Sequence, residues 1–282
     1  MSLSNFLVTL HFKLKKQYSK EYWEEKIANT KVEQVPPTPK IKDYKFIDDV
    51  FYFNENTNSD ITIFYIHGGA YLNTFDKYHF KFINKLIKKT NASIIAPNYK
   101  LIPFSYAKEV IENLFNLYKD YIEKCPNKKI IFMGDSAGGG ISLSLYLEIH
   151  KKGLKLPFKT IVLSPCTDIT MDNPKIEEYK KYDPWLYTDR LDVCLKYFAR
   201  DLDYKDYLVS PTYGNLDVFK NLLIFVGTKE ILNPDIIDFY NKLPDKDTNK
   251  LIIKDKMLHV YPILPIKEAK ESLSIITKYI LE

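Results

Sequence analysis

Short apolar runs alternate along the chain with longer segments in which apolar residues recur every three or four positions. The short runs predict strands, and the later ones are almost continuously apolar, as in a parallel sheet buried on both faces. These runs lie at residues 50–53, 61–66, 93–97, 129–133, 160–163, 222–226 and 250–253. The helical spacing covers residues 76–89, 105–123, 136–151, 234–242 and 266–280. Strand followed by helix, repeated, predicts an α/β fold with a mostly parallel central sheet flanked by helices.

Two segments fall outside this alternation. Residues 6–16 and 21–28 have helical spacing, and the sequence Pro36-Pro37-Thr38-Pro39 then interrupts the chain as a linker would. Between Thr167 and Phe219 about fifty residues separate two predicted strands, whereas such connections usually take roughly 2–6 residues. Within that stretch residues 188–199 predict a helix, with Thr188 as its N-cap. We therefore expect an insertion that lies over the top of the sheet.

Composition excludes several classes of protein. The chain has 282 residues, 45% of them hydrophobic, and a net charge of +5 that is spread along its length, so we expect no nucleic-acid partner. The longest apolar runs, 61–66 and 222–226, are far shorter than a membrane span, and we expect no membrane partner. The N-terminus does not have the pattern of a secretory signal. Three scattered cysteines predict neither a disulfide framework nor a zinc site, which favours a cytoplasmic protein.

Glycine is scarce, and six of the nine glycines form two clusters. In the second cluster a predicted strand runs into Gly134-Asp135-Ser136-Ala137-Gly138 and then into a predicted helix. This is G-x-S-x-G in the strand–turn–helix context that exposes a nucleophilic serine, with small residues required on both sides of Ser136. A P-loop would need Lys at position 140, and a dinucleotide fingerprint would need Gly at 143, where Gly140 and Leu143 stand. A plain left-handed turn remains the alternative, and we expect Asp135 to stabilise the turn.

The first glycine cluster, His67-Gly68-Gly69-Ala70-Tyr71, ends another predicted strand. An acyl-transfer serine needs backbone N–H donors aimed at the oxyanion, and paired glycines let the backbone approach closely. We therefore predict an oxyanion hole formed by the amides of Gly68, Gly69 and Ala137. His67 is expected to orient this loop rather than act as a base, with a buried core histidine as the alternative.

Together, HGGAY and GDSAGG resemble the hormone-sensitive-lipase-like family of α/β-hydrolases, the acetyl esterase and carboxylesterase group. The resemblance extends through most of the chain after about residue 60. Two weaker stretches also fit: residues 97–103 resemble the family's D-Y-R-L-A-P segment, and residues 163–168 resemble its S-P-x-x-D segment. The resemblance implies an α/β-hydrolase fold with a helical cap. We expect a core of residues 46–166 and 208–282, an N-terminal cap segment of residues 1–45 and a cap insertion of residues 167–207.

The remaining members of a triad should follow Ser136 in the order acid, histidine. Only His150 and His259 follow it, and His150 would lie about 20 Å away at the far end of the helix that Ser136 begins. His259 follows the last predicted strand and is the predicted base.

The acid has three candidates. Glu230 stands where the family usually has Asp, and it is the predicted acid. Asp235 is the alternative acid, although Asn233 as N-cap and Pro234 at the first helical position would explain it as a helix-start residue. Asp255 is close to His259 in sequence but on another loop. Asp168 and Asp183 are expected to be structural or capping residues.

By resemblance, the expected function is a serine carboxylesterase that hydrolyses short-chain acyl esters through an acyl-enzyme intermediate. A serine amidase, formamidase or peptidase would use the same triad, and a non-catalytic ligand-binding member of the fold is a third alternative. A lipase acting at lipid surfaces lacks support, because no apolar anchor or basic amphipathic helix stands out in the sequence. We expect a small-molecule ester as substrate and neither a metal nor an organic cofactor; a homodimer is left open.

Overall fold

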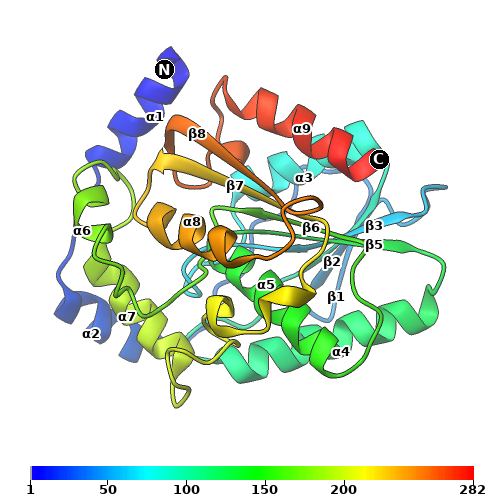
Figure 1. Ribbon diagram of the computed structural model, residues 1–282, viewed down its shortest axis with the longest axis horizontal. Coiled ribbons are helices and arrows are strands. Elements are labelled where there is room, and N and C mark those ends of the chain that lie inside the picture. The colour runs from blue at the N-terminus through cyan, green and yellow to red at the C-terminus, as the bar shows by residue number, and fades with distance from the viewer. Residues whose placement is uncertain (1) are drawn as a thin grey trace.

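One eight-stranded sheet forms the centre of the protein in the computed structural model, which describes residues 2–282 (Figure 1). Across the sheet the strands run in the order β1-β2-β4-β3-β5-β6-β7-β8. Strands β3 to β8 are parallel to one another, whereas β2 is antiparallel to both β1 and β4. The strands are β1 (Tyr44–Ile47), β2 (Val50–Phe53), β3 (Ile61–Ile66), β4 (Ser93–Pro97), β5 (Lys129–Asp135), β6 (Lys159–Leu163), β7 (Leu222–Lys229) and β8 (Lys250–Leu258).

The edges of the sheet differ from the sequence prediction. Strand β1 was not predicted, because three of its four residues are exposed and the strand therefore carries no burial signal. It pairs only with β2, across a turn in which Asp48 and Asp49 both have positive φ. Strand β8 continues to Leu258, five residues beyond the predicted end, because its pairing with β7 resumes after an irregularity at Gly227–Lys229.

Helices cover both faces of the sheet and enclose two separate cores. On one face, α3 (Lys77–Thr90) and α9 (Ala269–Leu281) pack on side chains such as Ile63 and Tyr65. On the other face, α4 (Ala107–Lys124), α5 (Ser136–Lys151) and α8 (Asn233–Lys242) pack on side chains such as Phe64 and Ile66. Successive residues of β3 thus enter opposite cores, which is the period-two alternation of a strand buried on both faces.

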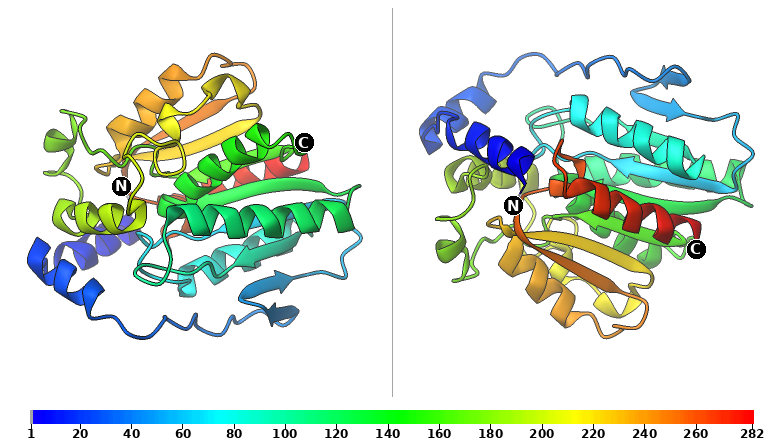
Figure 2. Two further views of the ribbon diagram at one scale, coloured as in Figure 1. Left: turned by 90° about the horizontal axis from the view of Figure 1, so that it is seen from below. Right: turned by 90° about the horizontal axis from the view of Figure 1, so that it is seen from above.

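The N-terminal helices and the insertion lie together at one end of the molecule (Figure 2). They comprise α1 (Leu3–Lys13), α2 (Lys20–Ala28), α6 (Ile176–Tyr179) and α7 (Thr188–Ala199). Lys20 at the start of α2 forms an ion pair with Asp192 of α7 at 2.5 Å, and the Arg190 guanidinium lies over the Trp23 ring. The predicted N-cap of α7 is one residue out of place: Tyr187 is the N-cap and Thr188 is already helical.

Candidate active site

Ser136 stands at the junction of β5 and α5 in a left-handed backbone conformation, with φ of +52°. The turn leaves no room for side chains on its neighbours. A Cβ on Gly134 would lie 2.6 Å from Ser142 Oγ, and one on Gly138 would overlap the carbonyl groups of Ile66 and His67. Glycine at both positions therefore allows the strained turn, and the N-terminus of α5 favours negative charge beside the serine.

His259 follows β8 and contacts two partners through its two ring nitrogens. Its Nε2 lies 2.8 Å from Ser136 Oγ, and its Nδ1 lies 2.6 Å from Glu230 Oε2. The chain turns sharply after it, because Val260 has a φ of +47°. The structure therefore brings together Ser136, His259 and Glu230, which come from the ends of three different strands.

Glu230 is completely buried, and its Oε1 atom, which does not face His259, accepts two hydrogen bonds. Oε1 accepts hydrogen bonds from Ser164 Oγ at 2.8 Å and from the Gly227 amide at 2.7 Å. Ser164 Oγ also accepts a hydrogen bond from the amide of Val260 at 2.9 Å. The Ser164 side chain therefore links the loop that carries Glu230 to the loop that carries His259. Ser164 had appeared in the sequence only as part of a weak motif, and no spacing pointed to this role.

The other two acid candidates lie elsewhere. Asp235 Oδ1 accepts from Asn173 Nδ2 at 2.9 Å, and Asp255 Oδ1 accepts from Thr228 Oγ1 at 3.0 Å. Burial raises the pKa of Asp235 to about 7, against the opposing hydrogen bond from Asn173. Asn233 is the first residue of α8 rather than its N-cap, and its side chain donates to the Gly227 carbonyl.

The His67–Gly69 loop packs directly against the serine. A Cβ on Gly68 would lie 3.0 Å from Ser136 Cβ, and Gly69 has a φ of +125°, which favours glycine. His67 is fully buried, and its Nδ1 donates to the Gly68 carbonyl at 2.7 Å. Burial, assisted by the charge of His79, lowers the pKa of His67 to about 3, so its imidazole is neutral. His67 is thus a buried histidine that also contacts the loop.

His79 and Asp135 form a buried pair of opposite charges beneath this loop, and no pattern in the sequence pointed to His79. His79 Nε2 lies 3.3 Å from Asp135 Oδ2, and Tyr65 donates to Asp135 Oδ1 at 2.7 Å. Burial alone would lower the pKa of His79, but the charges and hydrogen bonds of Asp135 and Asp76 raise it to about 10. Burial likewise opposes ionisation of Asp135, yet His79 holds its pKa below the usual value. Asp135 therefore does more than stabilise a turn, because its contact with His79 connects β5 to α3.

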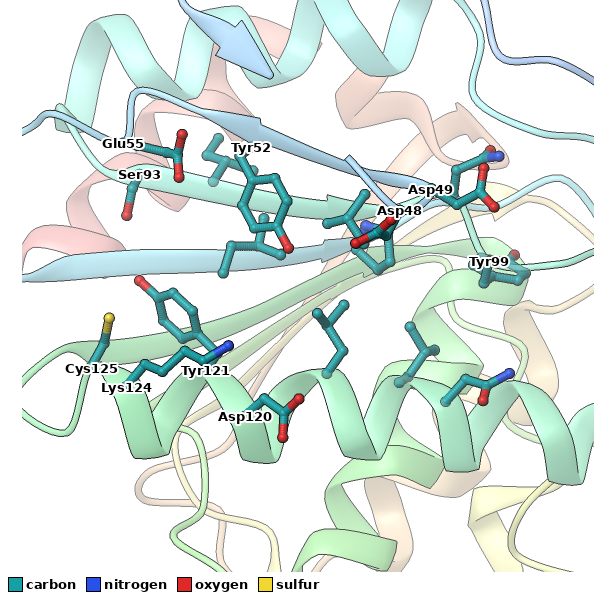
Figure 3. A pocket seen from close by; sticks show the side chains of 18 of the residues that line it. Asp48, Asp49, Tyr52, Glu55, Ser93, Tyr99, Asp120, Tyr121, Lys124 and Cys125 are labelled. Atoms are coloured by element: carbon teal, nitrogen blue, oxygen red, sulfur yellow. The ribbon is translucent and has the colours of Figure 1, made fainter. Parts of the chain in front are cut away.

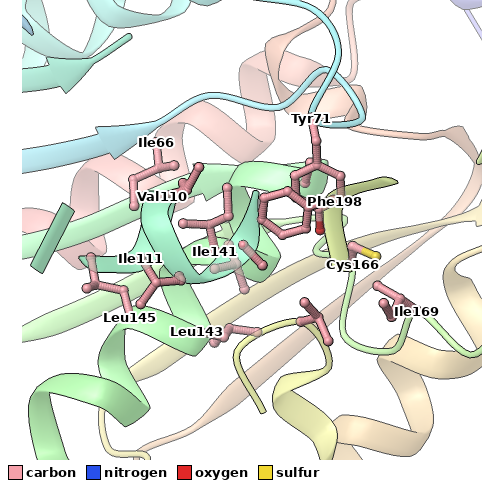
Figure 4. Close-up of a cluster of buried hydrophobic side chains, with 14 of the residues drawn as sticks. Ile66, Tyr71, Val110, Ile111, Ile141, Leu143, Leu145, Cys166, Ile169 and Phe198 are labelled. Carbon is pink, nitrogen blue, oxygen red and sulfur yellow. The ribbon is translucent and has the colours of Figure 1, made fainter. Parts of the chain in front are cut away.

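Aromatic side chains from the N-terminal helices and the insertion pack against the α/β core, and one of them contacts His259. Tyr71, from the loop after β3, stacks on Phe198 of α7 with ring centroids 3.6 Å apart, within a buried apolar cluster (Figure 4). On another side the Trp185 ring meets the His259 ring edge-on at 5.6 Å, and Phe12 of α1 stacks on Trp185 at 4.1 Å. Rings from α1 and from the insertion thus cover one side of His259.

Two cavities of different size lie in the described part of the chain. One of about 420 Å³ lies between residues 17–19 and 180–189, and Asp183 on its wall accepts from the amide of Ile231, next to Glu230. Burial raises the pKa of Asp183 to about 6. The other, about 690 Å³, lies between strands β2 and β4 on one side and helix α4 on the other, with Tyr52 and Tyr121 in its wall (Figure 3). The residues that line these two cavities include neither Ser136 nor His259.

Among residues 2–282, no group of three or more His, Cys, Asp and Glu side chains is arranged to hold a metal ion. No helix of the same range has both the length and the apolar character needed to cross a membrane.

Comparison with known proteins gives consistent matches. A family profile described as the alpha/beta hydrolase fold matches residues 63–263. An esterase of Acinetobacter venetianus is 31% identical over 187 residues, which cover 66% of this chain and 62% of the relative. An acetyl-hydrolase of Streptomyces hygroscopicus is 27% identical over 175 residues, covering 62% of this chain and 58% of the relative. The chain thus spans less than two thirds of the length of either relative.

A solved structure extends the likeness of the fold to the whole chain. The crystal structure of a hormone-sensitive lipase from a metagenome library has a TM-score of 0.84 at 22% identity, and the match covers 100% of this chain and 98% of that one.

Proposed function

The chain belongs to the alpha/beta hydrolase fold family, and from that membership we propose that it is a serine carboxylesterase that hydrolyses short-chain acyl esters. The observation that carries the proposal is the unbroken series of contacts from Ser136 Oγ through the His259 ring to Glu230. A serine hydroxyl is a weak nucleophile unless a positioned base takes its proton, and an imidazole 2.8 Å away can do so.

The reaction follows from that arrangement. His259 Nε2 takes the proton of Ser136 as Oγ attacks the ester carbonyl carbon, and the carbonyl oxygen becomes an oxyanion. The tetrahedral intermediate collapses as His259 returns the proton to the departing alcohol, which leaves an acyl group on Ser136. Water activated by the same imidazole then releases the carboxylic acid and restores the serine. Glu230 holds the ring with Nδ1 protonated and stabilises its positive charge during each transfer.

The oxyanion is stabilised in this proposal by the amides of Gly68, Gly69 and Ala137. Gly68 packs against the nucleophile, and Ala137 opens the first turn of α5, where the helix dipole favours negative charge. His67 orients the loop through its contact with the Gly68 carbonyl, and being neutral it adds no charge of its own.

We further propose that residues 1–45 and 167–207 act as a cap that limits the acyl group to a short chain. The Trp185 ring of the insertion supports this, since it meets the His259 ring edge-on at 5.6 Å. The stacked and almost wholly buried pair of Tyr71 and Phe198 joins α7 to the loop after β3. A relative that is an acetyl-hydrolase agrees with a small acyl group. Three free cysteines, Cys125, Cys166 and Cys194, support a cytoplasmic location.

The test compares Ser136→Ala with Ser274→Ala, a matched change at an exposed serine on α9. With p-nitrophenyl acetate as substrate, we expect kcat to fall about 10⁴-fold or more in Ser136→Ala and to stay unchanged in the control. A fluorophosphonate probe should label the wild-type protein and the control but not Ser136→Ala. Unreduced turnover in Ser136→Ala would refute the proposal. A parallel p-nitroanilide assay separates esterase from amidase, because faster cleavage of the anilide would identify an amidase.

A further inference from the structure

Helix α1 is oriented opposite to the usual helix on a protein surface. The side chains that it buries include the polar Asn5 and Thr9 together with Phe12. Five large apolar side chains on its other side are between 41% and 77% exposed. This α1 apolar face consists of Leu3, Phe6, Leu7, Leu10 and Leu14. At 100° per residue these five side chains fall within about one third of the helix circumference, so they form one continuous stripe.

The orientation is held by polar contacts together with one aromatic stack. Asn5 Nδ2 donates to the Lys256 carbonyl at 3.2 Å, next to the end of β8. At the start of the helix, Ser2 Oγ donates to Glu268 Oε2 at 2.7 Å. On the same side, Phe12 stacks on Trp185. These contacts leave the helix no easy rotation that would bury the leucines, so the apolar face is a stable feature of the surface.

Lysines outnumber acidic residues around this face, where Glu268 accepts hydrogen bonds from Ser2 at the start of the helix. The first twenty residues contain Lys13, Lys15, Lys16 and Lys20 and no acidic residue. In the part of the chain that the structure describes, Lys13, Lys15 and Lys16 form no ion pair, whereas Lys20 pairs with Asp192. Exposed Lys267 lies near the start of the helix, because its amide donates to Ser4 Oγ at 3.0 Å.

We propose that the α1 apolar face docks this protein on lipid surfaces that carry anionic headgroups. An apolar helix stripe bordered by lysines is the pattern that places a helix in the plane of a membrane interface, with the leucines among the acyl chains and the lysines at the headgroups. A second copy of the chain is a weaker fit. A stable protein interface buries about 800 Å² per partner, and five partly exposed side chains on an eleven-residue helix fall short of that.

Docking in this way would turn the triad side of the molecule toward the lipid. Phe12 of α1 touches Trp185, and Trp185 touches His259, so two aromatic contacts separate the helix from the base. The proposal reverses the sequence-based expectation that no apolar anchor is present. Val8 and Phe12 lie on the other side of the helix, so apolar residues occur on both sides of it in the sequence.

The experiment measures cosedimentation of the full-length protein with vesicles of phosphatidylcholine, with and without added phosphatidylserine. The test variant is Leu7→Ser/Leu10→Ser, at positions 55% and 41% exposed. The matched control is Phe158→Ser/Leu281→Ser, at positions 41% and 57% exposed; Phe158 precedes β6, and Leu281 ends α9. Because the two pairs of side chains are exposed to similar extents, 41–57%, the two variants should shift the thermal unfolding midpoint by similar, small amounts.

We expect the wild type and the control to bind vesicles that contain phosphatidylserine, and the test variant to bind roughly tenfold to hundredfold more weakly. Lys13→Gln/Lys15→Gln/Lys16→Gln should remove the preference for phosphatidylserine, and added salt should do the same. The proposal is wrong if the wild type binds neither vesicle, or if the test variant binds as well as the control. A dimer in sedimentation velocity that dissociates only in the test variant would instead identify the stripe as a contact between copies. None of these measurements depends on ester hydrolysis, so they stand apart from the test of the proposed function.

Discussion

Glu230 Oε2 lies 2.6 Å from His259 Nδ1, at a carboxylate whose other oxygen accepts two hydrogen bonds from Ser164 and Gly227. The Glu230 carboxylate is therefore held through both of its oxygens. Strand β7 extends three residues beyond the predicted end, and Glu230 follows it at once.

If Glu230 is the triad acid, Glu230→Gln should lower kcat with p-nitrophenyl acetate by about 10³–10⁴-fold, because the amide no longer favours the imidazole tautomer with Nδ1 protonated. Asp235→Asn is the matched change and should alter kcat by less than about threefold, since Asp235 contacts Asn173 rather than His259. Measuring both variants at one pH decides the assignment. A larger loss in Asp235→Asn would transfer the role to Asp235.

The second prediction concerns the glycine beside the nucleophile. In Gly68→Ala the new methyl group would lie 2.7 Å from the Asp135 carbonyl oxygen and 3.0 Å from Ser136 Cβ, so the loop must move. We expect kcat to fall about 10²–10³-fold, the usual effect of losing one oxyanion donor.

Gly153→Ala serves as its control. Gly153 has a φ of +69° with nothing within 4 Å of a new Cβ, so the change should cost about 1–2 kcal/mol of stability and leave kcat unchanged. Equal kcat values for the Gly68→Ala protein and the wild type would show that the amide at position 68 does not serve the reaction.

The third prediction is a pH dependence of stability from the pair of His79 and Asp135. The pKa of His79 is about 10 in the folded protein, against 6.5 as the ordinary value. A raised pKa means that the folded state holds the proton more tightly. The stabilisation is therefore complete below about pH 6.5 and is lost progressively as the pH rises toward 10. At low pH the pair weakens instead as Asp135, whose pKa is lowered, becomes protonated.

Accordingly, His79→Gln should lower the free energy of unfolding by about 3–5 kcal/mol at pH 6, because it leaves Asp135 as an unpaired buried charge. The difference in free energy of unfolding between the wild type and the variant should be smaller at pH 10 than at pH 6. Urea unfolding at both pH values measures it. His150→Gln, an exposed histidine in the last turn of α5, should change the free energy of unfolding by less than about 0.5 kcal/mol. If His79→Gln lowers the free energy of unfolding by the same amount at pH 6 and pH 10, the pair of His79 and Asp135 carries no charge.

Long, strongly patterned elements could be predicted closely, and elements without a burial signal could not. Strand β3 and helix α5 have the predicted limits, since β3 is almost continuously apolar and α5 begins at the turn that the G-x-S-x-G motif marks. Strand β1 and the short helix α6 were missed, because β1 is mostly exposed and α6 has four residues. The central strands pair as expected for a parallel sheet, while the end of β8 depended on an irregularity that no residue pattern marks.

For the site, local motifs identified the turn at Ser136 and the glycine pair at Gly68, and chain order pointed to His259. The catalytic roles of these residues remain predictions for the variants above to test. Neither Ser164 nor His79 could be picked out, because each meets its partner across more than fifty residues of chain.

The sequence by itself determined where the backbone must bend tightly and which segments must be buried. Those properties depend on neighbouring residues: a missing Cβ in Gly134 and Gly138, and apolar side chains at strand or helix spacing. The tertiary structure alone decided which carboxylate meets His259, which charges pair beneath the nucleophile and which side of α1 faces outward. These outcomes depend on distances between segments far apart in the chain, and such distances arise only when the sheet and its helices pack.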